Sequence, residues 1–375
     1  MYKNIILPAS ILAETIIGAG MFALPFVFLK AGLTTGIFYL IFFGLVFILL
    51  NLMYADIILR TPENHRFVGY AKTYLGSLGF WSGMLMTIFG TVFALTAYLV
   101  LSISFVDLIW PTASDIYKIL IFWFVSSAAI FWDVNKVAMS EFFILLGTAL
   151  IILVIFGFGL SNFNYASVTN LNFSYLFFPY GVVLFSLAGR SAIPTVLGYF
   201  RKNNEQPVRA KWPIIIGGLI PVFVYIIFVL GVLGFSSNVS EDSVSGLVGS
   251  LPFFVLAMLG ILGIITMWST YIVIGRDVKK SLEHDLGLHQ KIAGLATIIP
   301  PLLFYFLGFN NFLELISIVG SVFIGIEGIF VVLIWRKASK IESPEGHKIF
   351  DKINPLLIYL LILVFIGGVL YKLIY

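Results

Sequence analysis

The chain has 375 residues, of which 60% are hydrophobic and only 11% are charged, and its formal net charge is +4. Its mean hydropathy is +1.07, whereas a soluble domain carries about 25% charged residues. This composition excludes an ordinary soluble protein and indicates a membrane protein. The absence of Cys also excludes disulfides, thiolate metal sites and cysteine nucleophiles.

Long apolar segments predict eleven transmembrane helices, because each span needs about 20 residues. In chain order the predicted spans are 4–29, 33–59, 81–108, 117–134, 137–160, 173–200, 212–235, 249–274, 292–309, 312–335 and 354–374. The first could be a signal peptide, but it contains Glu14 and lacks a small-residue cleavage site, so we expect a mature span. The longest connections are 60–80, 201–211, 236–248, 275–291 and 336–353, which leave no room for a soluble domain. The sequence predicts a single all-α, polytopic membrane domain over residues 1–375.

The first span is interrupted by GAGMFALP, residues 18–25. In a helix interior Gly costs about 1 kcal/mol and Pro about 3 kcal/mol relative to Ala. Backbone groups freed at membrane depth must face protein, a water-filled cavity or a ligand. The sixth span carries a similar interruption in FSLAGRSAIPTVLGYF, residues 185–200, where small residues precede Pro194. Either interruption could also serve close helix packing, since Gly and Pro are common in membrane helices.

The two interruptions stand five spans apart, and an odd offset predicts two repeats of inverted topology. The expected repeats cover about 4–160 and 173–335, and 354–374 is an extra helix. In such folds the substrate and the coupling ion bind near the midplane, beside the broken helices 1 and 6.

Basic residues orient the predicted spans. With a cytoplasmic N-terminus, eighteen Lys and Arg residues fall in cytoplasmic loops and flanks, whereas only Lys30, Lys118 and Lys372 fall outside. This positive-inside asymmetry predicts an external C-terminus, and we expect location in the plasma membrane. The charges are spread over five loops without interleaved aromatic residues, so we expect no nucleic-acid partner. All four His residues lie in the same loops and predict no metal site.

The segment ETIIGAGMFALPFVFLKAG, residues 14–32, resembles the first helix of the amino acid/auxin permeases and of the bacterial hydroxy- and aromatic amino acid permeases. Both groups belong to the amino acid-polyamine-organocation superfamily. The sixth span with Pro194, the PPLLF motif at 300–304 and the eleven predicted spans extend the resemblance along most of the chain.

The resemblance implies a leucine-transporter-type fold with a 5+5 inverted repeat. It implies secondary active transport of an amino acid, neutral or aromatic, by alternating access and coupled to a proton or sodium gradient. A non-transporting amino acid sensor or scaffold on the same fold is the alternative. Because the sequence holds no Ser-His-Asp grouping, HExxH motif or phosphate loop, we expect no enzyme and no cofactor besides the coupling ion. The expected partners are the amino acid and the lipid bilayer, and the oligomeric state stays open.

The resemblance also implies binding residues at both interruptions. In the first, the backbone amides of Gly18, Ala19 and Gly20 would receive the substrate carboxylate, as open amides at a helix N-terminus favour. In the sixth span, the residues that would flank the amino group and the side chain are Ser186, Ala188, Gly189, Arg190 and Ser191. Tyr98 of the third span would reach in from the side, although a packing role would equally account for it.

Three ionisable residues lie deep in predicted spans, and such residues are by default functional. Glu14 and Arg190 are predicted to pair across the site, either as working parts or as a purely structural ion pair. Relatives place a neutral or histidine side chain where Arg190 stands, so the chain departs from the family pattern there. Glu327 is expected to be either a proton site or a structural carboxyl.

Coupling has two explanations at the sequence level. Sodium-driven members of the superfamily hold the cation between first-span carbonyls and eighth-span hydroxyls, which correspond here to Ile17, Ser269 and Thr270. The two hydroxyls could instead bond to their own helix backbone. Proton coupling through Glu14 is equally open, because burial favours the protonated carboxyl whereas pairing with Arg190 favours the ionised one.

Overall fold

The computed structural model of the protein describes residues 2–63, 65–131, 137–160, 172–235, 239–341 and 348–374, and all regular elements in these ranges are helical. Two of the residues assigned to loops from the sequence, Lys136 and His347, lie outside the described residues. The α-helices are α1 (Leu7–Ile16), α2 (Leu24–Ala31), α3 (Leu33–Arg60), α4 (Phe67–Asp107), α5 (Asp115–Ile130), α6 (Val137–Leu160), α8 (Pro179–Leu187), α9 (Ile193–Lys202), α10 (Lys211–Phe235), α11 (Phe253–His284), α12 (Gln290–Phe306), α13 (Phe312–Ile318), α14 (Gly325–Ala338) and α15 (Pro355–Ile374).

Short segments of tighter or wider helix connect several of these elements. The 3-10 segments are η2 (Ala19–Ala23), η3 (Phe173–Tyr175), η4 (Arg190–Ala192), η5 (Pro207–Ala210) and η6 (Ser245–Leu247). The π segments are η1 (Tyr2–Ile6) and η7 (Val319–Ile324). Irregular turns at membrane depth persist where the freed backbone groups find partners.

Among the described residues, eight helices or helix runs are long and apolar enough to cross a membrane. A ninth is the pair Tyr2–Ile16 and Ala19–Ala31, if it is counted as one span that is bent by 50° at the break. The remaining two predicted spans correspond to α5 and α12, which have 16 and 17 residues. Since a perpendicular crossing takes about 20 residues, length alone does not establish α5 and α12 as spans.

Two predicted loops are largely helical. The segment 60–80 contains the start of α4 at Phe67, and the segment 275–291 contains the last turns of α11, which runs to His284. Hydropathy marks only the apolar part of a helix, so the polar turns at both ends were assigned to loops. At Gly76 the backbone of α4 adopts φ 78°, which favours glycine, and divides the helix.

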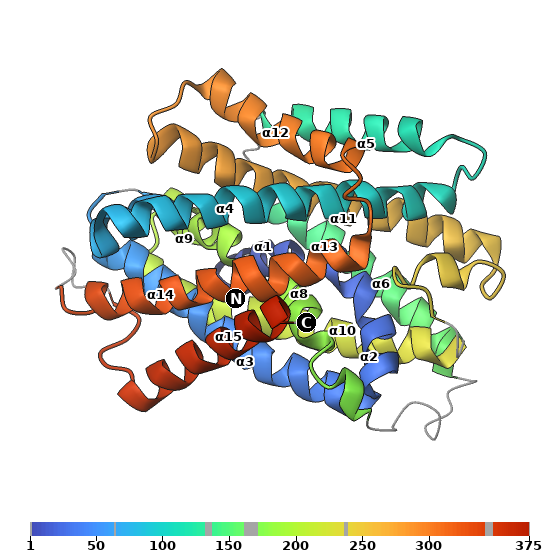
Figure 1. The fold of residues 1–375 in the computed structure, drawn as a ribbon, viewed down its shortest axis with the longest axis horizontal. Helices are drawn as coiled ribbons and strands as arrows, with labels where there is room; N and C mark the ends of the chain where they lie inside the picture. The colour runs from blue at the N-terminus through green and yellow to red at the C-terminus, as the bar shows by residue number, and fades with distance from the viewer. Residues whose placement is uncertain are drawn as a thin grey trace.

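The broken segments occupy the centre of the molecule (Figure 1). Every residue of α1 is buried, and α1 packs against α6, α10 and α11. On the other side of the centre, α8 packs against α3, α13 and η7. These neighbours surround both helices, so the side chains of α1 and α8 contact protein on all sides.

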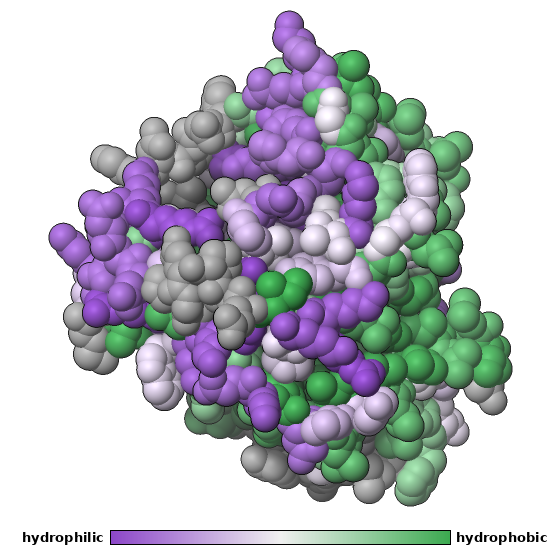
Figure 2. All heavy atoms as spheres, turned by 90° about the vertical axis from the view of Figure 1, so that its left-hand side faces the viewer, coloured by the Kyte–Doolittle hydropathy of each residue, from purple (hydrophilic) through white to green (hydrophobic). Residues whose placement is uncertain are grey.

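The outer helices expose large apolar side chains, as lipid contact requires. Examples are Phe143 and Leu150 on α6, Leu303 on α12 and Leu363 on α15. Figure 2 shows hydrophilic side chains gathered on the end of the molecule where α9 and α14 finish, with hydrophobic side chains along the flank. The exposed residues of this end include Arg201, Lys202, Arg336 and Lys337. The surface therefore has the polarity of a protein that crosses a bilayer.

Candidate functional site

The first interruption lies between α1 and η2. After Ile16 the backbone leaves the helix at Ile17, with φ −75° and ψ 73°, and Gly18 is extended at φ −117° and ψ −149°. The Gly18 amide donates to the Ile16 carbonyl at 2.8 Å, which closes a tight turn. The chain then resumes as η2, and Pro25 stands in the first turn of α2, where a missing N–H costs nothing.

The second interruption lies between α8 and η4. Ala188 is extended, with φ −69° and ψ 122°, and Gly189 follows at φ −142° and ψ 7°. As at the first interruption, a proline stands in the first turn of the helix that resumes, here Pro194 of α9. The matching sequence patterns therefore produce matching interruptions.

The two interruptions face each other. A Cβ placed on Gly20 would lie 2.6 Å from Ser186 Oγ, and one placed on Gly189 would lie 2.6 Å from the Ile16 side chain. Tyr225 of α10 joins them, because its buried hydroxyl lies 2.6 Å from the Ile16 carbonyl and 2.8 Å from the Ser186 carbonyl. One phenol thus serves the freed carbonyls of both interruptions.

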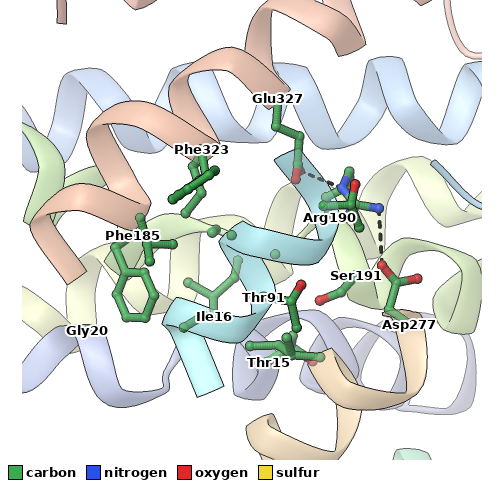
Figure 3. A pocket seen from close by; sticks show the side chains of 18 of the residues that line it. Thr15, Ile16, Gly20, Thr91, Phe185, Arg190, Ser191, Asp277, Phe323 and Glu327 are labelled. Atoms are coloured by element: carbon green, nitrogen blue, oxygen red, sulfur yellow. Dashed lines mark hydrogen bonds and ion pairs between the residues drawn. The ribbon is translucent and has the colours of Figure 1, made fainter. Parts of the chain in front are cut away.

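A cavity of about 90 Å³ lies between them (Figure 3). It is bounded by both interruptions, by α4, by α11 and by the η7–α14 segment. The lining residues singled out by the sequence analysis are Gly20, Tyr98, Ala188, Gly189, Arg190, Ser191 and Glu327. Phe185 and Phe323 add aromatic surface. Ligand pockets commonly measure about 300–1,000 Å³, so the cavity is contracted in this conformation and an aromatic amino acid would require side chains to move.

The first-span amides are less open than the sequence suggested. A Cβ on Gly18 would collide with the Tyr98 hydroxyl, and that hydroxyl accepts a hydrogen bond from the Ala19 amide. Gly18, Ala19 and Ser186 do not line the cavity. Ser186 instead donates to the Val182 carbonyl of its own helix at 2.7 Å. Close packing therefore explains Gly18, and Gly20 both packs tightly and borders the cavity.

Arg190 is the centre of a charge network. Its Nε lies 2.5 Å from Glu327 Oε1 and its Nη1 lies 3.2 Å from Asp277 Oδ2, and Asp277 Oδ1 lies 3.3 Å from Arg66 Nη1. The Arg190 guanidinium also lies over the Phe67 ring, 4.7 Å from its centroid. Figure 3 shows the guanidinium turned toward the two carboxylates.

The predicted pair of Glu14 and Arg190 is therefore wrong in this structure. The side chain of Arg190 extends away from α1, because two carboxylates on α11 and α14 lie on the other side of η4. Asp277 was assigned to a loop from its polar surroundings in the sequence, and the continuation of α11 through this position buries it. Glu327 is the closer of the two carboxylates that pair with Arg190. This ion pair does not test the predicted proton role of Glu327.

A second, larger cavity of about 680 Å³ adjoins the first. It lies between the starts of α1 and α6, the length of α9 and the last turns of α11, and Ser191 and Asp277 line both cavities. The Arg190 network thus stands between a small central cavity and a vestibule at the polar end of the molecule.

The predicted coupling residues lie on α1 and α11. Thr270 Oγ1 donates to the Thr266 carbonyl of its own helix at 3.2 Å and approaches the Glu14 carbonyl at 3.4 Å. Ser269 Oγ instead lies 2.8 Å from both carboxyl oxygens of Glu141. Ile17 uses its amide to cap α1 by donating to the Ala13 carbonyl at 2.9 Å. The Thr270 hydroxyl therefore bonds to the backbone of its own helix, as one of the two alternatives predicted, whereas the Ser269 hydroxyl bonds to Glu141.

Three residues of this region were missed from the sequence. Glu141 and Tyr225 stood inside predicted spans, where a polar side chain is itself a signal of function or of a freed backbone partner. Asp277 offered a weaker signal, namely its position directly after Arg276 at the end of an apolar segment.

Comparison with known proteins places this geometry in a family. The model of the tryptophan/tyrosine permease family matches residues 1–372. No curated protein matches the chain at a significant level.

Among solved structures, MhsT in complex with L-phenylalanine is similar to this chain with a TM-score of 0.70 and 14% identity, covering 98% of this chain and 97% of MhsT. Mhp1, a nucleobase-cation-symport-1 family transporter in a closed conformation with bromovinylhydantoin bound, is similar with a TM-score of 0.66 and 11% identity. That match covers 97% of this chain and 89% of Mhp1. At these identities the similarity shows the shared fold alone.

Proposed function

Because the chain belongs to the tryptophan/tyrosine permease family, and is thus a multi-pass membrane permease rather than an enzyme, we propose that it carries a neutral or aromatic amino acid across the plasma membrane by alternating access, coupled to a proton or sodium gradient. The observation that carries the proposal is the cavity between two facing helix interruptions. Such interruptions provide opposite helix ends for the two charged groups of an amino acid.

The proposed substrate pose follows from these helix ends. The carboxylate lies toward η2 and the backbone of Gly20, where a helix begins, and the amino group lies toward the carbonyl end of α8, near Ala188. The side chain extends toward Phe185 and Phe323, whose rings suit an apolar or aromatic group. Gly18, Ala19 and Ser186 then support the pose through packing, and Tyr98 lies between Gly18 and the cavity. Sodium at Ile17, Ser269 and Thr270 remains one of the two proposed modes of coupling.

The proposed topology has eleven crossings, with α5 and α12 as short spans and the bent pair as the first. The repeats cover about 4–160 and 173–335, and α15 is the extra helix. This order gives a cytoplasmic N-terminus and an external C-terminus, and it places the 680 Å³ vestibule on the cytoplasmic side, where the exposed basic residues gather.

Transport is tested with the purified protein in liposomes. Labelled L-tryptophan, L-tyrosine, L-phenylalanine and L-alanine are offered under imposed proton or sodium gradients. We expect accumulation of at least one of them against its gradient. Binding without uptake would favour the non-transporting sensor. The absence of both binding and uptake would reject the proposed substrate class.

The topology is tested by cysteine labelling, which the absence of native Cys makes simple. Glu205→Cys, beyond α9, should react with a membrane-impermeant maleimide only after the membrane is permeabilised. Ser240→Cys, in the predicted outer loop, should react in intact cells. The reverse pattern would overturn the orientation.

A further inference from the structure

Two buried carboxyl groups lie beside the first interruption. Glu14 on α1 is 0% exposed and Glu141 on α6 is 6% exposed. The two groups interact electrostatically, and their helices pack directly against each other. Both carboxyls are buried in the protein interior, where a charged group is costly unless it is paired.

Glu141 is provided with partners and Glu14 is not. Ser269 donates to the Glu141 carboxyl at 2.8 Å, and Arg276 lies near enough to attract its charge. Neither carboxyl oxygen of Glu14 has a hydrogen-bond partner among the described residues. The Thr266 hydroxyl lies near the Glu14 carboxyl, and it shares a 2.7 Å hydrogen bond with the Thr148 hydroxyl in which either oxygen can be the donor.

Among the described residues, the other elements around α1 bring no cation that acts on Glu14. From α4 comes Tyr98, whose hydroxyl serves the Ala19 amide, and from α10 comes Tyr225, whose hydroxyl serves two carbonyls. From η4 comes Arg190, which is turned to Asp277 and Glu327. Arg276 of α11 also donates to the Ala129 carbonyl at 2.8 Å. Among the described residues, Arg276 therefore interacts with Glu141 and not with Glu14.

We propose that Glu14 and Glu141 together hold one exchangeable proton, and that this proton is the ion coupled to transport. Two carboxylates in a water-poor site do not both ionise, because desolvation and mutual repulsion oppose the second charge. With its Ser269 donor and Arg276, Glu141 is suited to be the ionised member of the pair. Glu14, whose carboxyl oxygens make no close hydrogen bond among the described residues, is suited to carry the proton. This inference rests on the proposed transport function.

The pair lies between the two cavities. Thr15 and Ile16, which follow Glu14 on α1, line the central cavity. The vestibule is lined by Ala138, one helical turn before Glu141, and by Arg276, which lies near Glu141. A movement of α1 against α6 and α11 would change the separation of the carboxyls and therefore their affinity for the proton. The proton is taken from water on one side of the membrane and returned to water on the other, with no other bond changed. Substrate and proton are then coupled through the position of α1.

The experiment measures proton movement in liposomes that contain the protein and a trapped pH-sensitive dye. The substrate is the one among L-tryptophan, L-tyrosine and L-phenylalanine that is taken up. A pH difference of one unit drives at most about tenfold accumulation for one coupled proton. Glu14→Gln and Glu141→Gln should each reduce accumulation to near unity and abolish substrate-driven proton uptake, while exchange of substrate across the membrane persists.

Two further variants keep the result interpretable. Glu314→Gln makes the same chemical change at an exposed carboxyl at the start of α13, and it should keep the accumulation and proton uptake of the unmodified protein. Ser269→Ala removes the donor to Glu141 without removing a carboxyl. Because that donor favours the ionised form, half-maximal accumulation should move to higher pH, and an unchanged pH profile would count against the pair even where a Glu variant does not fold.

The outcomes separate this inference from the proposed function. Normal proton uptake in either Glu→Gln variant overturns the shared proton. Accumulation driven by sodium with no proton movement also overturns it, while leaving transport itself established. Absence of uptake by the unmodified protein under every gradient would reject the proposed function instead.

Discussion

The two helix interruptions have similar sequences but different surroundings. At the second, Arg190 forms ion pairs with Glu327 and Asp277, so that charges from three elements meet between the central cavity and the vestibule. At the first, the Glu14 carboxyl has no close hydrogen-bond partner in the part of the chain that the structure describes, and the turn is enclosed by Gly18, Tyr98 and other close contacts. The comparison indicates that electrostatics hold the second interruption and packing holds the first. Substitutions should therefore affect the two in different ways.

The largest effect is expected at Arg190. Arg190→Gln leaves Glu327 without its cation. Loss of one partner costs about 3–5 kcal/mol in a fully buried ion pair, and we expect a smaller cost here because the Glu327 side chain is 23% exposed. We expect a lower thermal stability in detergent and little or no transport. Adding Glu327→Gln should recover part of the stability, whereas adding Glu14→Gln should be additive. Recovery with Glu14→Gln and not with Glu327→Gln would show that Arg190 pairs with Glu14 instead of Glu327.

The next effect is expected at the two glycines of the first interruption. Gly18→Ala and Gly20→Ala should each cost about 1–3 kcal/mol through overpacking, with reduced uptake. Tyr98→Phe should relieve Gly18→Ala, because it removes the colliding oxygen. Ser186→Ala should not relieve Gly20→Ala, because the Ser186 Cα would still lie 2.7 Å from the new Cβ. Paired melting and uptake measurements check this, and full stability of both Gly variants would remove packing as the explanation.

A smaller effect is expected at Tyr225, which serves both interruptions. Tyr225→Phe removes the donor to two buried carbonyls and should cost about 1–2 kcal/mol. Tyr54→Phe is a matched control, because the Tyr54 hydroxyl is buried without a hydrogen-bond partner among the described residues. Equal melting temperatures for the two variants would show that the carbonyls do not depend on Tyr225.

The smallest effect is expected outside both interruptions, at Asp242. Burial opposes ionisation there, but hydrogen bonds from Ser104, Ser240 and Ser245 outweigh it and hold the pKa of Asp242 below its ordinary value. A carboxyl with a lowered pKa in the folded state stabilises the protein above its unfolded pKa of about 4 and loses this contribution as the pH falls through the folded pKa. Asp242→Asn should cost about 1 kcal/mol at neutral pH, and its difference from the unmodified protein should shrink below about pH 4. A melting series between pH 3 and pH 7 checks both statements.

Much of the fold was predictable from residue patterns. Apolar length identified the membrane helices, and the clusters of Gly and other small residues before Pro25 and Pro194 identified both interruptions, whereas the Pro residues inside α10 and α12 did not end those helices. The polar ends of α4 and α11 were not identified, since hydropathy does not register helix that continues beyond the apolar core. For the site, the resemblance identified the cavity residues Gly20, Ala188 and Gly189. Their small side chains leave the interrupted backbone accessible from the cavity.

The sequence alone identified Glu14, Arg190 and Glu327 as ionisable residues that need a partner or a function, because such residues are costly in a bilayer in any fold. It also indicated the two interruptions in the first and sixth spans, since backbone preferences act locally, but not the division of α4 at Gly76. Only the tertiary structure decided which charges meet. Pairing depends on the rotation and spacing of helices far apart in the chain, so Arg190 joined Glu327 and Asp277. The same packing left Glu14 facing Glu141, because α1 lies directly against α6.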